Sequence, residues 1–373
     1  MSSLLRILGT LGAGLAIACG VRAAPFAFIT NCGSNDVSVI DIATDRVVAT
    51  VPVGACPYGV AVSPGGAHAY VTNRDDASLS VIDGTTLRES ARIPVGTRPT
   101  GVAVDPSGRR VYVANLWSDA ISVIDTAAHA VVATVSVAPV ARYPAGIVVH
   151  PDGSRLYVVA DMVTPSFAGW ILVLDARSLG IVASIAVGYP DAGIAIDASG
   201  ARVYVSGLYG GSIIDTAANR AIGTLVPTTG APLVAVAVDP AGTTVYASAA
   251  YPGGPPPPPL FNAVTIVNVA SGAVAGSIPF DSPRGLAVNP SGTRVYVAHG
   301  ANTVSVIDTA TRTVVRTIAV GTWPVALGPF IPPAALEPRV ADIPTLSPAA
   351  LIALAIVATI VGARSLRWRR EDT

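Results

Sequence analysis

Short runs of apolar residues alternate with small polar clusters along most of the chain. The stretch Arg284–Pro324 shows this pattern clearly, because it holds four apolar runs and the turn sequence Asn289-Pro290-Ser291-Gly292. Asn and Pro suit the first two positions of a tight turn, and Gly can adopt the positive φ that the turn requires. Four runs joined by tight turns predict an antiparallel meander. The predicted strands are Gly285–Val288, Arg294–His299, Val304–Asp308 and Val314–Val320.

Copies of this four-strand unit recur along the chain. Each second strand carries a Tyr or Phe, each third strand ends in Asp or Asn, and a Pro closes each unit. We expect the Asp and Asn side chains to accept hydrogen bonds from the backbone of the following turn. Because one such sheet cannot bury both of its faces, the copies must stack on one another, as the blades of a β-propeller do. The repeated aromatic residues are Phe28, Tyr70, Tyr112, Tyr157, Tyr204, Tyr246 and Tyr296, and the closing prolines are Pro57, Pro99, Pro144, Pro190, Pro232, Pro283 and Pro324.

The order of the strand types predicts how the ring closes. The last copy of the first strand type is Val325–Phe330, whereas the chain enters the pattern on a second strand, at Phe26. The sequence therefore predicts an all-β, seven-bladed propeller of four-stranded antiparallel blades over residues 25–331. Pairing of the N- and C-terminal strands would remove the open sheet edge. Pro329 is tolerable in the closing strand only at an unpaired position.

The second strands also carry a family resemblance. YVTN at Tyr70–Asn73 and YVAN at Tyr112–Asn115 resemble the YVTN-repeat family of seven-bladed propellers, over roughly residues 26–331. The resemblance implies the fold. It does not imply one function, because propellers of this kind include binding modules as well as lactonase-like and quinoprotein-like enzymes.

Residues 1–24 are typical of a cleavable export signal. Arg6 precedes the apolar run Ile7–Ala18, and small residues allow cleavage between Ala23 and Ala24. The run is shorter than a membrane-spanning helix requires. Lipoprotein processing at Cys19 is the alternative.

The C-terminal end has a different character. Residues 332–342 are a linker, and residues 343–373 contain Ile343-Pro344-Thr345-Leu346-Ser347, the apolar span Leu346–Ala363 and a cluster of arginines. The span is at the lower limit for a bilayer helix, and the arginines place its C-terminal end in the cytoplasm. The arrangement resembles the IPTL-type sorting signal of Gram-negative bacteria, although Pro348-Ala349 replaces the usual Glu-Trp. The resemblance implies transient anchoring in the inner membrane, processing by an exosortase-like membrane protease, and delivery to the cell surface or extracellular matrix. A periplasmic location and an ordinary single-pass anchor are the alternatives.

Two cysteines remain after removal of the signal. Cys32 would lie in a second-to-third strand loop and Cys56 in a link between blades, and both connections occupy one face of the same blade. Because an exported protein folds in an oxidising compartment, we expect a Cys32–Cys56 disulfide.

Charge and motif content exclude several classes of function. The net charge is zero, and all 23 basic residues are Arg. A nucleic-acid partner would require a basic excess, so none is expected. No haem-attachment, phosphate-loop or nucleophile-elbow motif is present, and the four histidines are scattered. We therefore expect a monomer without metal or other cofactor, and no catalytic residue is assigned.

Candidate binding residues lie on the face that carries the long connections. Insertions at Ala138–Tyr143, Ala160–Gly169 and Ala250–Asn262 all fall on this face, where binding residues are usually found. Arg and aromatic side chains beside the closing prolines are typical of interaction sites, and His299 is expected at the mouth of the central channel. The candidates are Asn73, Arg98, Asn115, Trp117, Tyr143, Tyr189, Asp191, Arg284, His299 and Trp323.

The sequence thus predicts an exported, non-catalytic binding or scaffold module whose partner is a surface polysaccharide or a protein. The alternative is a propeller enzyme of lactonase-like or quinoprotein-dehydrogenase-like type. Only His299, Asp191 and Arg284 occupy unique positions suited to catalysis.

Overall fold

The computed structural model describes residues 26–138, 140–161, 169–225, 231–250 and 262–333. The predicted export signal and the predicted sorting tail lie outside these residues. Within them, no helix is long and apolar enough to span a membrane.

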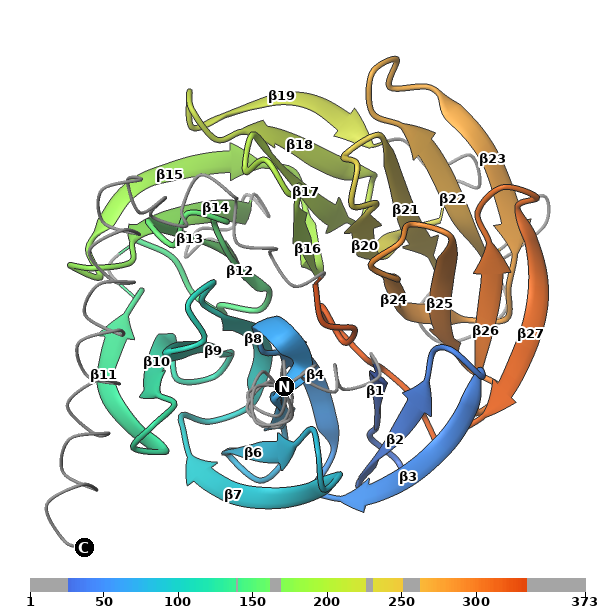
Figure 1. Ribbon diagram of the computed structural model, residues 1–373. Helices are drawn as coiled ribbons and strands as arrows, with labels where there is room; N and C mark the ends of the chain where they lie inside the picture. The colour runs from blue at the N-terminus through green and yellow to red at the C-terminus, as the bar shows by residue number, and fades with distance from the viewer. Residues whose placement is uncertain (1–25, 139, 162–168, 226–230, 251–261, 334–373) are drawn as a thin grey trace, which may run out of the picture. The chain divides into compact units, whose positions relative to one another are not determined.

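Seven antiparallel sheets form a closed ring around a central axis (Figure 1). In the described residues six sheets have four strands, and the sheet of the first blade has three. This architecture confirms the predicted seven-bladed propeller. Blade 1 contains β1 (Phe26–Asn31), β2 (Asp36–Asp41) and β3 (Arg46–Pro52); blade 2 contains β4 (Pro57–Val62), β5 (His68–Asn73), β6 (Ser78–Asp83) and β7 (Arg88–Pro94), with a short 3₁₀ turn at Pro64–Gly66.

The remaining blades follow the same order from the axis to the rim. Blade 3 contains β8 (Pro99–Val104), β9 (Arg110–Asn115), β10 (Ala120–Asp125) and β11 (Ala130–Ser136). Blade 4 contains β12 (Ile147–Val149), β13 (Arg155–Asp161), β14 (Gly169–Asp175) and β15 (Ile181–Val187). Blade 5 contains β16 (Pro190–Ile196), β17 (Arg202–Gly207), β18 (Gly211–Asp215) and β19 (Arg220–Leu225). Blade 6 contains β20 (Leu233–Val238), β21 (Thr244–Ala249), β22 (Ala263–Asn268) and β23 (Val274–Pro279), and blade 7 contains β24 (Pro283–Val288), β25 (Arg294–His299), β26 (Thr303–Asp308) and β27 (Thr313–Ala319).

The repeated residues hold the blades as the sequence predicted. The aromatic residue of each second strand is buried between blades, and Phe28, Tyr112 and Tyr296 are among the largest fully buried side chains. The Asp or Asn that ends each third strand accepts backbone hydrogen bonds in the next turn, as in the bond from Thr86 N to Asp83 Oδ1 at 2.7 Å. These residues are therefore part of the scaffold.

The ring closes through both ends of the described chain. We call Pro324–Phe330 the closing segment, which takes the inner position of blade 1 beside β1. Pro324 bridges Asn31, Val325 N donates to Thr30 O at 2.9 Å, and Phe28 N donates to Phe330 O at 2.9 Å. The predicted strand Val325–Phe330 is thus in the predicted place but is not a regular strand. The reason is local backbone geometry, because φ is 48° at Ala326 and 106° at Gly328.

Candidate functional site

Two kinds of connection meet on one side of the propeller, which we call the loop face: the second-to-third strand loops and the links between blades. Backbone hydrogen bonds tie the two kinds together. Arg74 N donates to Cys56 O at 3.0 Å, and Leu116 N donates to Arg98 O at 3.0 Å. Residues beside the closing prolines are therefore held at fixed positions around the axis.

The residue before the closing Pro has a left-handed backbone at several links. Its φ is 48° at Cys56, 55° at Arg98, 52° at Tyr143 and 55° at Trp323. This conformation is unfavourable for most residues other than Gly and persists only where the surrounding structure imposes it. Because chemically different side chains share it, the conformation belongs to the repeat, and any specificity lies in the side chain displayed.

Large aromatic side chains are exposed on the loop face. Trp117 is 59% exposed, Tyr143 42%, Tyr209 80% and Trp323 52%, and all four lie in second-to-third strand loops or blade links. Among the described residues, every exposed large aromatic side chain is on this face. Exposed aromatics gathered on one side of a rigid scaffold indicate a binding surface.

Three arginines of this face stack on aromatic rings. The guanidinium carbon of Arg98 lies 4.2 Å from the ring centroid of Trp117, and that of Arg284 lies 5.3 Å from the ring centroid of Trp323. The guanidinium of Arg74 lies 4.8 Å from the centroid of the Tyr58 ring. Such cation–π contacts hold the guanidinium planes in place.

We call Tyr58, Arg74, Arg98, Asp191 and Arg284 the axial mouth. Tyr58, Asp191 and Arg284 each directly follow the closing Pro of their own blade, so they occupy equivalent positions around the axis. Burial raises the pKa of Tyr58; the cations of Arg74, Arg284 and Arg98 oppose this rise, and the Asp191 carboxylate adds to it. Burial also lowers the pKa of Arg284. All four charged groups therefore lie close enough to act on one phenol.

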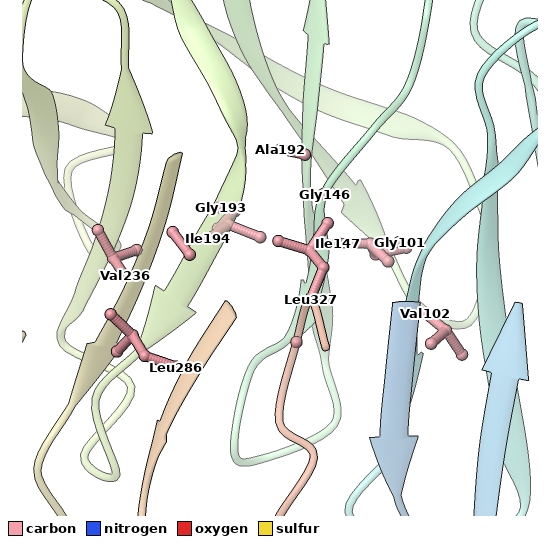
Figure 2. A pocket seen from close by; sticks show the side chains of 12 residues that line it. Gly101, Val102, Gly146, Ile147, Ala192, Gly193, Ile194, Val236, Leu286 and Leu327 are labelled. Carbon is pink, nitrogen blue, oxygen red and sulfur yellow. The ribbon is translucent and has the colours of Figure 1, made fainter. Parts of the chain in front are cut away.

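The inner strands are closely packed, and residues with small or apolar side chains line a small cavity between them. A Cβ added at Gly59 would lie 2.0 Å from Thr100 O, and one added at Gly101 would lie 2.2 Å from Ala145 O, so the inner strands of neighbouring blades approach to backbone contact. The axial cavity measures about 10 Å³ and is lined by residues such as Ile147 and Leu327 (Figure 2). It holds at most a single water molecule. A ligand at the mouth would therefore find no room in this cavity.

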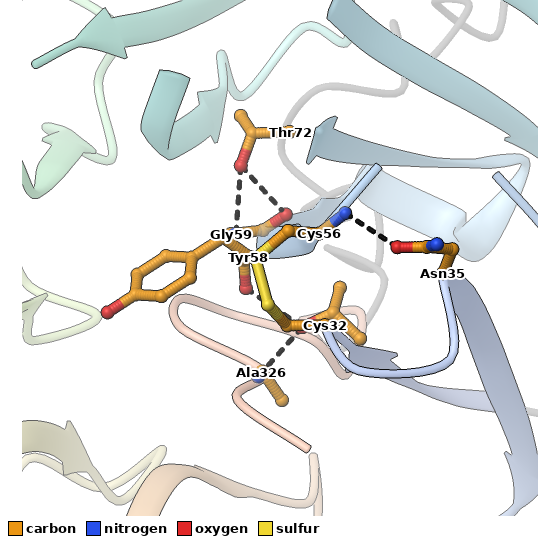
Figure 3. Close-up of a disulfide and its surroundings, with 8 residues drawn as sticks. Cys32, Asn35, Cys56, Tyr58, Gly59, Thr72 and Ala326 are labelled. Atoms are coloured by element: carbon orange, nitrogen blue, oxygen red, sulfur yellow. Dashed lines mark hydrogen bonds between the residues drawn. A yellow bond between two sulfur atoms is a disulfide. The ribbon is translucent and has the colours of Figure 1, made fainter. Parts of the chain in front are cut away.

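A disulfide stands beside this cluster. It joins Cys32 to Cys56, two residues before Tyr58, and Asn35 Oδ1 accepts a hydrogen bond from Cys56 N at 2.8 Å (Figure 3). The carbonyl of Tyr58 accepts from Thr30 Oγ1 at 2.8 Å. In Figure 3 the Tyr58 ring extends away from the disulfide. The start of β4 is therefore anchored from two sides.

Three of the candidate residues lie in the interior. Asn73 Nδ2 donates to Ser80 Oγ at 2.8 Å, Asn115 Nδ2 donates to Ser122 Oγ at 2.9 Å, and His299 Nε2 lies 2.9 Å from Ser305 Oγ. All three side chains turn outward to the third strand of their blade and are buried. The expectation that His299 reaches the channel mouth is wrong, because its ring takes the place that Asn has in other blades.

Tyr189 and Asp191 lie at the entrance to blade 5. The Tyr189 ring meets the ring of Tyr209 edge to face at a centroid distance of 5.1 Å, and Asp191 Oδ1 accepts from Ala192 N at 2.6 Å. Seven of the ten candidates thus lie on the loop face: Arg98, Trp117, Tyr143, Tyr189, Asp191, Arg284 and Trp323.

Tyr58, Arg74 and Tyr209 were not among the candidates predicted from the sequence. A signal for Tyr58 was available, because it occupies the repeat position of Asp191 and Arg284. Arg74 follows Asn73 directly. Tyr209 lies in a short loop whose sequence has no counterpart in the other blades. For metal ions, no group of three His, Cys, Asp or Glu residues is suitably arranged in the part of the chain that the structure describes.

Comparisons with known proteins support the fold. No protein-family profile and no curated protein sequence matches the chain. Among solved structures, the chain is similar to hydrazine synthase of Kuenenia stuttgartiensis, with a TM-score of 0.61, 22% identity, and coverage of 71% of this chain and 87% of that one. It is also similar to a protein provisionally described as a 6-phosphogluconolactonase from Bacteroides uniformis, with a TM-score of 0.64, 18% identity, and coverage of 81% and 98%.

A third similar structure is the dihydro-heme d1 dehydrogenase NirN in complex with DHE. The TM-score is 0.54 at 14% identity; the match covers 79% of this chain and 63% of NirN. At these identities the likeness establishes a propeller fold that enzymes also use, and it assigns no activity to this chain.

Proposed function

We propose that this protein is an exported, non-catalytic binding or scaffold propeller of the bacterial cell surface or extracellular matrix, whose ligand face is the loop face. The observation that carries the proposal is the concentration of exposed aromatic rings and stacked arginines on that face. Trp, Tyr and Arg are the residues that most often dominate binding energy.

The disulfide and the chain ends supply the location in this proposal. A Cys32–Cys56 bond is stable in an oxidising compartment and fits an exported protein. The YVTN and IPTL-type resemblances add the rest: the signal at residues 1–24 directs export, and an exosortase-like protease processes the tail that Leu346–Ala363 anchors. The partner is a surface polysaccharide or a protein on the same surface.

Cell fractionation tests this proposal with the full chain produced in a Gram-negative host that carries an exosortase-like protease and makes a surface polysaccharide. The propeller is expected in the polysaccharide fraction, and a variant with Trp117→Ala and Tyr209→Ala is expected to appear in the medium instead. The matched control replaces Val132 and Val182, which are exposed on the outer strands β11 and β15, with Ala. Equal retention of the two variants, or recovery of the wild type only from the inner membrane or periplasm, would contradict the proposal.

The alternative is a propeller enzyme, and the enzymes among the structural neighbours favour it. Tyr58, with Arg284 and Asp191 among the charged groups that act on its phenol, is the part of the loop face best suited to chemistry. A hydrolysis assay with a sugar lactone tests the alternative. Turnover by the wild type that is lost in Arg284→Ala but kept in Arg316→Ala, an exposed change on β27, would establish the enzyme and overturn the non-catalytic proposal.

A further inference from the structure

Two groups of arginines in the propeller differ in their partners. On the face opposite the loop face, arginines at the start of second strands donate to the next blade: Arg110 to Ala176 O at 3.2 Å and Arg155 to Thr216 O at 3.1 Å. Arg294 pairs with Asp45 across the closure of the ring. These arginines join neighbouring blades, so the fold accounts for them.

The arginines of the axial mouth have no such partners. Within the described part of the chain, the side chains of Arg74, Arg98 and Arg284 make no hydrogen bond and no salt bridge, and their specific side-chain contacts are the stacked rings. The Nε atom of each is shielded from solvent without an acceptor. Shielded donors of a charged group are costly to leave unpaired. A surface ligand cannot reach these Nε atoms, but the terminal Nη atoms of the same side chains are not shielded and have no acceptor among the described residues. The fold does not account for these three side chains, and their Nη atoms can donate to a ligand.

The charged groups of the axial mouth indicate the charge of that ligand. The mouth holds three guanidinium cations and one carboxylate, Asp191, which already accepts a hydrogen bond from Ala192 N. The Tyr58 phenol stays protonated at neutral pH, since burial raises its pKa, and it adds a hydroxyl donor. The local excess is positive although the chain has no net charge. An anion would neutralise this excess.

We propose that the axial mouth binds a carboxylate group of an acidic polysaccharide, held by Arg74, Arg98 and Arg284 with the Tyr58 hydroxyl. The inference rests on the proposed function and names its ligand class. Guanidinium forks match the two oxygens of a planar carboxylate. Trp117 and Trp323 extend the site outward from the arginines and offer apolar faces for the neighbouring sugar rings. The small cavity near the axis has no room for the chain of the polymer.

Titration calorimetry of the full chain in detergent tests the inference with a defined probe, polygalacturonate. Binding is expected to weaken as salt is raised and to be lost when the carboxyl groups of the probe are reduced to alcohols. The combined change Arg98→Gln and Arg284→Gln should lower the affinity about tenfold or more, as the loss of charge-assisted hydrogen bonds predicts. The control Arg46→Gln with Arg316→Gln removes the same charge from the exposed outer strands β3 and β27 and should leave the affinity within about twofold, as expected for screened surface charges.

The outcomes separate the two proposals. Equal binding of the reduced and the acidic polymer by the wild type, with loss in the Trp117→Ala variant, would overturn the carboxylate assignment and leave the binding function standing. Tight binding of monomeric galacturonate or of dextran sulfate in place of polygalacturonate would also overturn it. Absence of binding to every polysaccharide would overturn both. Because the polymer-reduction arm uses the wild type, it decides the inference even if the arginine variants do not fold.

Discussion

At the scale of single residues, one repeat position explains why a histidine that resembled a functional residue is structural. The position that ends the second strand holds Asn31, Asn73, Asn115 and His299, and each side chain contacts a Ser of the adjacent third strand. The imidazole is buried against the Phe280 ring, with a centroid distance of 5.4 Å. His299 therefore makes the hydrogen bond that asparagine makes in other blades, but its imidazole can also take up a proton.

Replacement of His299 by Asn should change the pH dependence of stability. Burial lowers the pKa of His299, and Asp281 only partly opposes this effect. The imidazole takes up its proton near pH 6.5 in the unfolded chain and at a lower pH in the folded protein. The free energy of unfolding therefore falls as the pH decreases from about 7 to about 5. Urea unfolding at several pH values should show a shallower fall in His299→Asn than in the wild type.

The exposed His129 supplies the control for this measurement, as His129→Asn removes an imidazole from a surface turn. Parallel stability curves for His299→Asn and the wild type would show that burial of His299 has no thermodynamic effect.

Several residues of the candidate site could be predicted from the sequence. Arg98, Arg284 and Trp323 were predictable, because each flanks a closing Pro of the repeat. Trp117 was predictable from its place in a second-to-third strand loop. Their pairing into stacks was not, since Arg284 and Trp323 belong to different blade entrances and meet only through tertiary structure. Asn73 and Asn115 were wrongly expected on the binding surface. The strand order predicts that each lies at the loop-face end of its strand, but it does not predict to which side of the strand the side chain points.

At the scale of elements, buried hydroxyls join blades 1, 2, 3, 5 and 6 to the blade that follows. Thr30, Thr72, Ser206 and Ser248 occupy one position of the second strand and donate to the inner strand of the following blade. In blade 3 this position is Ala114, and Thr100 of the inner strand donates to Ala145 O at 3.0 Å instead. The bond is therefore kept even where its usual donor is lost.

Removal of one such hydroxyl should destabilise the propeller. Thr72 is fully buried; its Oγ1 accepts from Gly59 N at 2.8 Å and donates to Thr100 O at 2.8 Å. Thr72→Val keeps the shape but leaves a buried N–H and a carbonyl without this partner, at a cost of about 2 kcal/mol. Urea unfolding should report the loss, whereas Thr85→Val, in an exposed turn, should cost less than about 0.5 kcal/mol. If Thr72→Val lowered the free energy of unfolding by no more than Thr85→Val does, water or a backbone shift would have to replace the two hydrogen bonds.

The closing segment marks the limit of prediction at this scale. Its position beside β1 followed from the order of strand types, and its pairing with Thr30 and Phe28 is observed. Its irregular path did not follow, because the sequence Gly328-Pro329 has no counterpart in the other inner strands. Gly328 has a φ of 106° and packs where a Cβ would lie 2.7 Å from Val60 O. Contact with β4 of the next blade, rather than local propensity, sets this geometry.

At the scale of the whole molecule, the sequence determines the ring much more visibly than the site. Each blade repeats the same local signals, so seven copies reinforce one prediction. The axial mouth is different, because it takes two residues from blade 2 and one each from blades 3, 5 and 7, and it forms only when the ring is closed. Its construction also depends on how blade 1 is completed from both ends of the described chain.

The Cys32–Cys56 disulfide connects these two features, since it ties the completed first blade to the strand that begins with Pro57 and Tyr58. The bond closes a segment with a sequence separation of 24 residues, and its removal should lower the free energy of unfolding by about 3 kcal/mol. Urea unfolding of the variant Cys32→Ser/Cys56→Ser should show this loss, and a thiol reductant should lower the stability of the wild type but not of the variant. We also expect the start of β4 to become more mobile without the disulfide, so the Cys32→Ser/Cys56→Ser variant should bind polygalacturonate more weakly. Unchanged stability of the wild type on reduction would mean that the hydrogen bonds of Thr30 and Asn35 hold β4 without the covalent link.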